Sequence, residues 1–168
     1  MQQIEIERKY LILFPDVDAM RELPGFSKSN ITQIYLNSQT GVTHRVRSRT
    51  TDGVTVYTEN TKIRIDKISC IETENEISED RFMTLRENIR VGSHPLTKTR
   101  YLFSYMERTI EIDVYPQWKN AAVMEIELPD KNTIPHIPDF IKIIREVTGE
   151  AEYSNSNMSH RFPKEPHL

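Results

Sequence analysis

The sequence has 168 residues, of which 28% are charged and 37% hydrophobic, and its 22 basic and 25 acidic side chains leave a net charge of −3. This length predicts one domain over residues 1–168 with a substantial core. The slight acidic surplus argues against a general nucleic-acid or membrane-surface binder, although it is compatible with a local basic pocket.

The chain is expected to act in the cytoplasm. Its N-terminus has neither the basic nor the apolar region of a secretory signal, and no apolar run approaches the length of a membrane span. The single cysteine, Cys70, has no cysteine or histidine nearby at metal-ligand spacing. We therefore interpret it as a reduced structural thiol.

The pattern along the chain predicts mainly β-structure, beginning with a strand in which apolar and charged residues alternate. Such alternation is typical of a strand, because successive side chains there point to opposite faces. In chain order, strands are predicted over residues 4–13, 31–36, 42–49, 54–57 continuing into 61–65, 70–77 as the fifth strand, 96–103, 108–114 and 122–129. The pair Asp52 and Gly53 is a strong hairpin signal after the third of these strands.

Helices are predicted over residues 15–21, 79–87 and 138–149. Ser78 is placed to cap the second helix. The third is expected because Pro138 suits the first turn of a helix and Gly149 would lie at its end. The tail segments 154–157 and 163–168 are expected to be loop, frayed at the end of the chain.

The charged faces of the predicted strands carry one sign each, apart from the first strand. Their basic residues are Lys9, Arg45, Arg47, Arg49, Lys62, Arg64, Lys98 and Arg100. Their acidic residues are Glu5, Glu7, Glu72, Glu74, Glu76, Glu111, Asp113, Glu125 and Glu127. A solvated sheet surface usually mixes signs, because like charges two residues apart repel. We therefore predict an α+β, mainly β fold: a closed eight-stranded antiparallel β-barrel with a charged, water-filled lumen and helices packed outside.

A charged lumen needs either pairing or a ligand, because an unpaired charge away from bulk water is costly. A polyanion bound together with divalent cations would match both signs. Arginine and lysine suit phosphate oxygens, and clustered carboxylates suit Mg²⁺ or Mn²⁺. The alternative is a salt-bridge network that only holds the barrel together, and the surplus acid on three separate strands argues against it.

These residues resemble the CYTH superfamily, the triphosphate tunnel metalloenzymes, which include inorganic triphosphatases, thiamine triphosphatases and class IV adenylate cyclases. The N-terminal Glu-x-Glu-x-Lys motif of the family is met by Glu5, Glu7 and Lys9. Its later motifs follow in order at residues 33–36, 45–47, 61–63, 74–77, 98–101, 111–113, 125–128, 146–149 and 153–155. The resemblance implies an eight-stranded antiparallel tunnel, the fold that the charge alternation predicts independently.

Carried over position by position, the resemblance implies roles for the charged residues. The triphosphate binders are Lys9, Arg45, Arg47, Lys62, Lys98 and Arg100. The ligands of Mg²⁺ or Mn²⁺ are Glu5, Glu7, Asp113, Glu125 and Glu127. The catalytic candidates are Lys98, Glu74, Glu76 and Tyr35, with Glu111 as a further helper for a second ion or a water. The implied chemistry is metal-assisted hydrolysis of a phosphoanhydride.

Two aromatic residues, Tyr35 and Trp118, have alternative placements. Tyr35 shares the parity of Gln33 and can face the lumen, although a core or rim position is the commoner fate of such a tyrosine. Thiamine recognition would use an aromatic platform, and the only tryptophan, Trp118, lies in a turn that either reaches a tunnel mouth or is exposed.

Inorganic triphosphate is the favoured substrate, because its hydrolysis needs only a phosphate cradle and metals. A class IV-type adenylate cyclase would need a base pocket and usually has additional residues upstream, whereas four residues precede Glu5. A non-catalytic polyphosphate- or nucleotide-binding module is the alternative of a different class, and the five carboxylates assigned to metal argue against it. We expect a monomer or homodimer whose partner is a small-molecule triphosphate, with no nucleic acid or membrane partner.

Overall fold

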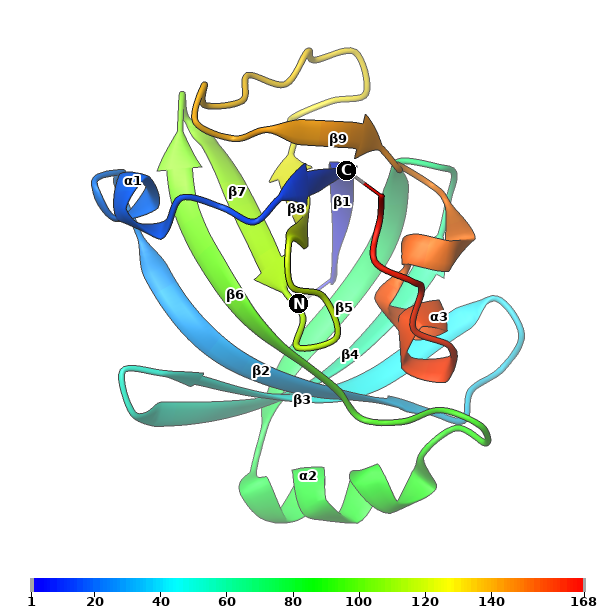
Figure 1. Ribbon diagram of the computed structural model, residues 1–168. Coiled ribbons are helices and arrows are strands. Elements are labelled where there is room, and N and C mark those ends of the chain that lie inside the picture. Colours follow the sequence, from blue (N-terminus) through cyan, green and yellow to red (C-terminus); the bar gives the residue numbers. More distant parts are fainter. Residues whose placement is uncertain (1, 168) are drawn as a thin grey trace.

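The structure, a computed structural model that describes residues 2–167, is an antiparallel β-barrel closed by the pairing of β1 with β5 (Figure 1). Its strands are β1 (Gln2–Leu13), β2 (Ser27–Leu36), β3 (Val42–Thr51), β4 (Val54–Arg64), β5 (Ser69–Ile77), β6 (Leu96–Tyr105), β7 (Arg108–Val114), β8 (Ala121–Glu127) and β9 (Ile143–Glu146). The order around the barrel is β5-β4-β3-β2-β6-β7-β8-β1, and β9 adds to β1. The prediction of a closed eight-stranded antiparallel barrel is confirmed.

The helices are short and lie outside or at the rim of the barrel. They are α1 (Val17–Arg21), α2 (Glu79–Leu85) and α3 (Asn155–His160), with 3₁₀ turns η1 (Arg86–Asn88) and η2 (Ala151–Tyr153). Asp16 and Ser78 cap α1 and α2 by accepting hydrogen bonds from backbone N–H groups, each at 3.1 Å. These two helices agree with the prediction. No described helix is long and apolar enough to cross a membrane.

The β3–β4 hairpin has the turn that its sequence predicts. Asp52 and Gly53 have φ values of 49° and 79°, and positive φ at both central positions is what a tight hairpin turn of this hand requires. The predicted segments 54–57 and 61–65 belong to one strand, β4, which runs without a break between them. The polar stretch between these segments stays in the ladder, where Asn60 pairs with Arg45 of β3 and Glu74 of β5.

The predicted helix over residues 138–149 is wrong. A turn, in which the Ile141 N–H donates to the Pro138 carbonyl at 3.0 Å, leads into strand β9. The reason is the free edge of β1: β5 pairs with β1 only as far as Ile6, and beyond it the backbone groups of β1 need other partners. Strand β9 supplies them by pairing with residues 10–12 of β1.

The expectation that residues 154–157 form loop is wrong for residues 155–157, which begin helix α3. The Ser154 hydroxyl caps this helix by accepting from the Asn157 N–H at 3.2 Å. Met158, which is 2% exposed, anchors the helix in an apolar cluster. Residues 163–167 are loop as predicted, and Leu168 lies outside the described residues.

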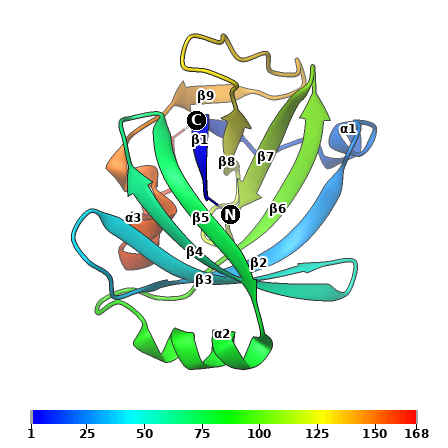
Figure 2. The ribbon, with the colours of Figure 1, turned by 180° about the vertical axis from the view of Figure 1, so that it is seen from behind.

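Helices α1 and α2 lie outside the barrel (Figures 1 and 2). Two apolar clusters cover its outer face. One lies on β1, β6, β7 and β8, where Phe103 and Ile112 pack with α1 and with residues 137–141. The other lies on β2 and β3, under Phe82 of α2. The outer wall of β1 and β4 differs from the prediction of helices over the apolar faces, since Ile4 and Ile63 are 66% and 48% exposed.

A third cluster fills one end of the lumen, and we call it the apolar plug. Leu11 and Val123 lie two residues from Lys9 and Glu125 on the same strands, so alternation turns them to the same inner face. The plug consists of Leu11, Leu96, Tyr115, Trp118, Ala121, Val123, Val147, Tyr153 and Met158. The lumen is therefore charged along part of its length and closed by apolar packing at one end.

Candidate active site in the barrel lumen

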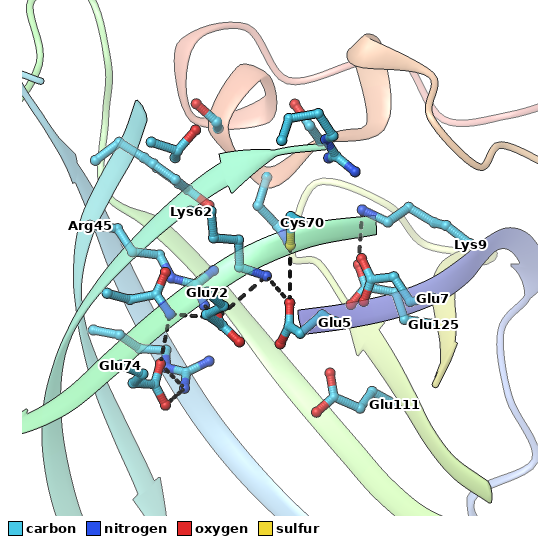
Figure 3. Close-up of a pocket in the computed structure, with 18 of the residues that line it drawn as sticks. Glu5, Glu7, Lys9, Arg45, Lys62, Cys70, Glu72, Glu74, Glu111 and Glu125 are labelled. Atoms are coloured by element: carbon cyan, nitrogen blue, oxygen red, sulfur yellow. Dashed lines mark hydrogen bonds and ion pairs between the residues drawn. The ribbon is translucent and has the colours of Figure 1, made fainter. Parts of the chain in front are cut away.

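The charged faces of the strands enclose a cavity of about 310 Å³, part of which is shown in Figure 3. Its basic lining residues are Lys9, Arg45, Arg47, Arg49, Lys62, Arg64 and Arg100. Its acidic lining residues are Glu5, Glu7, Glu72, Glu74, Glu111, Glu125 and Glu127. The equal numbers of both signs explain how so many charges share one cavity.

The two signs are not evenly mixed around the lumen. The basic wall is formed by β3 and β4, which carry Arg45, Arg47, Arg49, Lys62 and Arg64. Five of the carboxylates lie on β1, β7 and β8, which are Glu5, Glu7, Glu111, Glu125 and Glu127. In the strand order, β3 and β4 are four places from β8 and β7, so these walls face each other across the barrel.

Lys62 lies at the centre of a cluster that joins β1, β4 and β5 (Figure 3). Its Nζ lies 2.6 Å from Glu5 Oε2 and 3.4 Å from Glu72 Oε1. Burial and a hydrogen bond with Glu72 raise the pKa of Glu5 to about 7. Burial alone would raise the pKa of Glu72, but the hydrogen bond with Glu5 and the charge of Lys62 lower it to about 2. The two carboxyls therefore share a hydrogen bond beside one ammonium group.

Lys9 is held between β8 and the C-terminal segment. Its Nζ lies 2.8 Å from Glu125 Oε1 and donates to the Tyr153 carbonyl at 3.3 Å. The neighbouring Glu7 and Glu127 are register partners on β1 and β8, and neither forms an ion pair with any residue in 2–167. Burial and Glu125 raise the pKa of Glu7, while burial and Glu111 raise that of Glu127. This part of the lumen is short of positive charge.

On the basic wall, by contrast, acidic partners are in short supply. Arg47 Nη2 donates to both oxygens of Glu74, at 3.1 and 3.0 Å, while burial and the nearby Arg45 lower the pKa of Arg47 to about 10. The Nε atoms of Arg45 and Arg47 are buried and have no hydrogen-bond partner within the described chain. Two guanidinium groups with spare donors thus face the cavity.

Two of the predicted site residues, Lys98 and Asp113, do not line the cavity but form a buried group with Arg100. Lys98 Nζ lies 2.6 Å from Asp113 Oδ2, and Arg100 donates to the same carboxylate at 2.7 and 2.8 Å. Burial and Arg100 lower the pKa of Lys98 to about 7. Arg100 also contacts Glu111 and does line the cavity. Asp113 therefore binds both Lys98 and Arg100 on the side of Arg100 that is away from the cavity, and it holds the guanidinium in position.

The remaining predicted residues divide into those that line the cavity and those that lie outside it. Glu74 and Tyr35 line the lumen, whereas Glu76 is exposed and lies outside the cavity lining. Tyr35 is only 3% exposed, and its hydroxyl accepts a hydrogen bond from Gln33 Nε2 at 3.0 Å. Trp118 occupies neither expected place: it is buried in the apolar plug, where its indole N–H donates to the Pro163 carbonyl at 3.1 Å.

Several lining residues were not selected from the sequence. Asn60 lines the lumen and donates to Glu74 at 3.2 Å. It lies between the predicted segments 54–57 and 61–65, and its parity with Lys62 is the signal that could have indicated this. Ser154 and Ser156 reach the cavity from α3, for which the sequence has no apolar periodicity. Cys70 was interpreted as structural, yet it lines the lumen with its Sγ 3.5 Å from Glu5 Oε2, and burial raises its pKa to about 11.

The donor atoms of the acidic wall are carboxylate oxygens, which suit a hard divalent cation. No three carboxylate, thiol or imidazole groups among residues 2–167 already converge on a common point that could hold a metal. Glu7 and Glu127 nevertheless are register partners that form no ion pair within residues 2–167, and Glu125, the register partner of Lys9, lies two residues further along β8. The chemistry of this donor set fits a divalent cation, provided that these side chains turn toward it.

Comparison with known proteins agrees with this architecture. An inorganic triphosphatase from Acetivibrio thermocellus is 41% identical over 64 residues, which are 38% of this chain and 40% of that protein. The crystal structure of the inorganic triphosphatase NE1496 matches with a TM-score of 0.58 and 25% identity, covering 95% of this chain and 96% of the other. The PH1819 protein from Pyrococcus horikoshii OT3 matches in fold, with a TM-score of 0.57 and 22% identity over 76% of this chain and 80% of its own.

The fold and the lumen define a closed β-barrel with basic and acidic residues on its inner walls. No protein-family model matches the chain. The closed barrel with charged inner walls and the similarity to inorganic triphosphatases agree with the resemblance of the strand motifs to the CYTH superfamily. The match to the Acetivibrio thermocellus protein spans about two fifths of that relative's length.

Proposed function

We propose that this protein is a divalent-metal-dependent triphosphatase whose favoured substrate is inorganic triphosphate. The observation that carries the proposal is the lumen itself. On its basic wall, the Nε atoms of Arg45 and Arg47 have no hydrogen-bond partner within residues 2–167, and on its acidic wall, Glu7 and Glu127 form no ion pair within the same residues. A bound polyphosphate and a cation would neutralise both walls together. The names of the Acetivibrio thermocellus relative and of NE1496, both inorganic triphosphatases, support the same activity.

The basic wall would bind the phosphates through Arg45, Arg47 and Lys62. Each charge-assisted hydrogen bond to a phosphate oxygen contributes about 1.5–3 kcal/mol. Lys9 and Arg100 would add contacts from the other side. Arg47 would exchange one of its bonds to Glu74 for a phosphate oxygen, and its free Nε provides a second donor without breaking any existing bond.

The acidic wall would hold the metal through Glu7, Glu125 and Glu127, with Glu5 at its edge. When bound there, Mg²⁺ or Mn²⁺ would neutralise charge on the phosphates and lower the pKa of a coordinated water. The assignment of Asp113 as a further ligand competes with its two cationic partners, so we assign it and Lys98 to positioning Arg100. Tyr35 lies beside Arg45 and can donate its hydroxyl proton to a phosphate oxygen.

Hydrolysis adds water across a P–O–P linkage. The water oxygen bonds to the terminal phosphorus, the bridging P–O bond breaks, and the proton lost by the water ends on a lumen carboxylate or phosphate. Glu74 is the catalytic candidate that lines the cavity, whereas exposed Glu76 lies too far outside to contribute directly. Arg100 and Lys9 are placed to stabilise charge that develops on the leaving phosphate.

The alternatives find less support in the lumen. Among the described lining residues, Tyr35 is the one aromatic side chain, so a thiamine ring or a nucleobase would have little to stack on. A module that only binds polyphosphate would have no use for Glu7 and Glu127, whose unneutralised charge opposes the binding of an anion. Both observations favour an inorganic substrate and a metal.

The test is phosphate release from inorganic triphosphate, thiamine triphosphate, ATP and long-chain polyphosphate, each with Mg²⁺, Mn²⁺ or EDTA. Cyclic AMP is measured in the ATP reactions. We expect the fastest release from inorganic triphosphate and none in EDTA. Binding without release from any of the four would favour the binding module, and cyclic AMP formation would favour a cyclase.

A further inference from the structure

Arg47 lies between two polar side chains to which the proposed function gives no role. In the register of the barrel, Gln33 of β2 lies opposite Arg47 on one side, and Thr58 of β4 lies opposite it on the other. Residues that are directly opposite in an antiparallel ladder share a face and have Cβ atoms about 4.5–5.5 Å apart. Because Arg47 lines the lumen, Gln33 and Thr58 point to the inner side of the barrel and flank it. We call these three residues the Arg47 row.

Each member of the Arg47 row has a buried polar atom without a hydrogen bond. These atoms are Gln33 Oε1, Arg47 Nε and Thr58 Oγ1, none of which has a partner within residues 2–167. Gln33 is 0% exposed and Arg47 is 9% exposed. Buried polar groups are nearly always hydrogen-bonded, because an unpaired one keeps the full cost of leaving water. Three such atoms side by side therefore indicate a row whose hydrogen bonds are completed when a ligand binds.

The chemistry of the three atoms is complementary. Arg47 Nε is a donor, Gln33 Oε1 is an acceptor, and the Thr58 hydroxyl can accept. A guanidinium group has five N–H donors in a fixed plane. In the structure its Nη2 is turned to Glu74, to whose two oxygens it donates at 3.1 and 3.0 Å. This orientation leaves the acceptors of Gln33 and Thr58 unused.

Gln33 is also bonded to Tyr35, which lines the same cavity. Its Nε2 donates to the Tyr35 hydroxyl at 3.0 Å, so that Oε1 lies on the other branch of the amide. Since the phenol oxygen accepts this bond, the hydroxyl proton of Tyr35 remains available for an acceptor in the lumen. Gln33 thus adjoins two residues, Tyr35 and Arg47, that the proposed function assigns to the phosphates.

We propose that Gln33 and Thr58 are positioning residues, which accept hydrogen bonds from the Arg47 guanidinium when it turns from Glu74 to a bound phosphate. The phosphate draws one side of the guanidinium into the lumen, and Gln33 Oε1 and Thr58 Oγ1 accept from the N–H groups that do not face it. The hydrogen bonds of the Arg47 row are therefore complete only in the bound state. This inference rests on the proposed function, because it requires a phosphate at Arg47.

The first test separates the hydroxyl of Thr58 from its methyl group. Thr58→Val keeps the shape and removes the hydroxyl, whereas Thr58→Ser keeps the hydroxyl and removes the methyl group. Calorimetry with inorganic triphosphate in EDTA measures the dissociation constant without turnover. We expect Thr58→Val to raise this constant about fivefold to tenfold and Thr58→Ser to change it less than twofold. A residue that only packs would give the reverse order, and that result would overturn the role of Thr58.

The second test asks whether the effect passes through Arg47. In the Arg47→Ala background, Thr58→Val should change the dissociation constant less than twofold, because the donor that it serves has been removed. Gln33→Met, which removes the amide at similar volume, should weaken binding at least about tenfold, since it acts on Tyr35 and Arg47 together. The melting temperature of ligand-free Thr58→Val should not fall, because the hydroxyl that it removes has no partner there.

The matched control is Thr61→Val, which removes a hydroxyl from the outer face of the same strand. It should leave the dissociation constant unchanged. Wild-type affinity of Thr58→Val and Gln33→Met, or an equal effect of Thr58→Val with and without Arg47, would overturn the positioning role while leaving the triphosphatase intact. Failure of the wild-type protein to bind triphosphate would overturn the proposed function and this inference with it.

Discussion

Replacing Asp113 with asparagine removes the carboxylate that forms an ion pair with Lys98 inside the barrel. The Lys98 and Asp113 side chains are 1% and 2% exposed, and their charged atoms lie 2.6 Å apart. The substitution hardly changes the shape of the side chain, so its effect measures charge rather than packing. It distinguishes a buried structural carboxylate from the metal ligand that the family resemblance implies.

The structure sets the size of the expected effect. Removing one partner of a buried ion pair costs about 3–5 kcal/mol, because the other charge remains uncompensated. Arg100 keeps its contacts with Glu111 and Glu125, so Lys98 is the cation left alone. Burial and Arg100 already lower its pKa to about 7, so it can lose its proton, and we expect the lower end, about 3 kcal/mol. For a chain of this size that is a fall in melting temperature of about 6–12 °C.

Thermal unfolding followed by circular dichroism in EDTA measures this loss without any contribution from metal. Glu127→Gln is the matched control, because Glu127 is a lumen carboxylate that forms no ion pair in residues 2–167. Its removal should change the free energy of unfolding by less than about 0.5 kcal/mol. A wild-type melting temperature for Asp113→Asn, combined with loss of metal-dependent turnover, would refute the reasoning and restore Asp113 as a ligand.

Three further predictions follow from the lumen and its rim. Glu7→Gln should abolish divalent-dependent phosphate release and leave the melting temperature unchanged, because Glu7 pairs with no cation in the described chain; unchanged release would remove it from the metal site. Arg47→Ala should raise the dissociation constant for inorganic triphosphate at least about tenfold by calorimetry, and an unaltered constant would exclude Arg47 from binding. Arg90→Ala should lower the stability by about 2 kcal/mol, because the guanidinium holds α3 through Ser156 Oγ at 2.8 Å and its carbonyl at 2.6 Å. Arg86→Ala is the control in the same segment between α2 and β6, and it should leave the stability unchanged. Equal melting temperatures for the two variants would contradict the role of Arg90.

Much of the barrel could be predicted from local pattern alone. Alternation in β1 places Glu5, Glu7 and Lys9 on one face, and this holds whatever the rest of the chain does. The single sign of each charged face then indicates an enclosed lumen. The Asp52–Gly53 turn is equally local, because positive φ at both positions depends on these two residues and their strands.

The C-terminal third shows where local pattern is insufficient. Phe140, Ile141, Ile144 and Val147 have the spacing of an amphipathic helix, yet they belong to a turn and a strand. Pairing with the edge of β1 beyond Ile6 overrides this helical pattern, and that edge exists only after the barrel has closed. Helix α3 likewise depends on the apolar plug, into which Met158 packs.

By itself, the sequence determined which side chains face inward, because side-chain direction in a strand is a property of two neighbouring residues. Only the tertiary structure decided how deep each inward residue lies. Lys98 and Asp113 have the same parity as the lumen residues but are buried against each other beside the apolar plug, whereas Glu76 is exposed beyond the cavity. Depth follows from strand register, barrel closure and the C-terminal plug, and these arise from contacts between segments far apart in the chain.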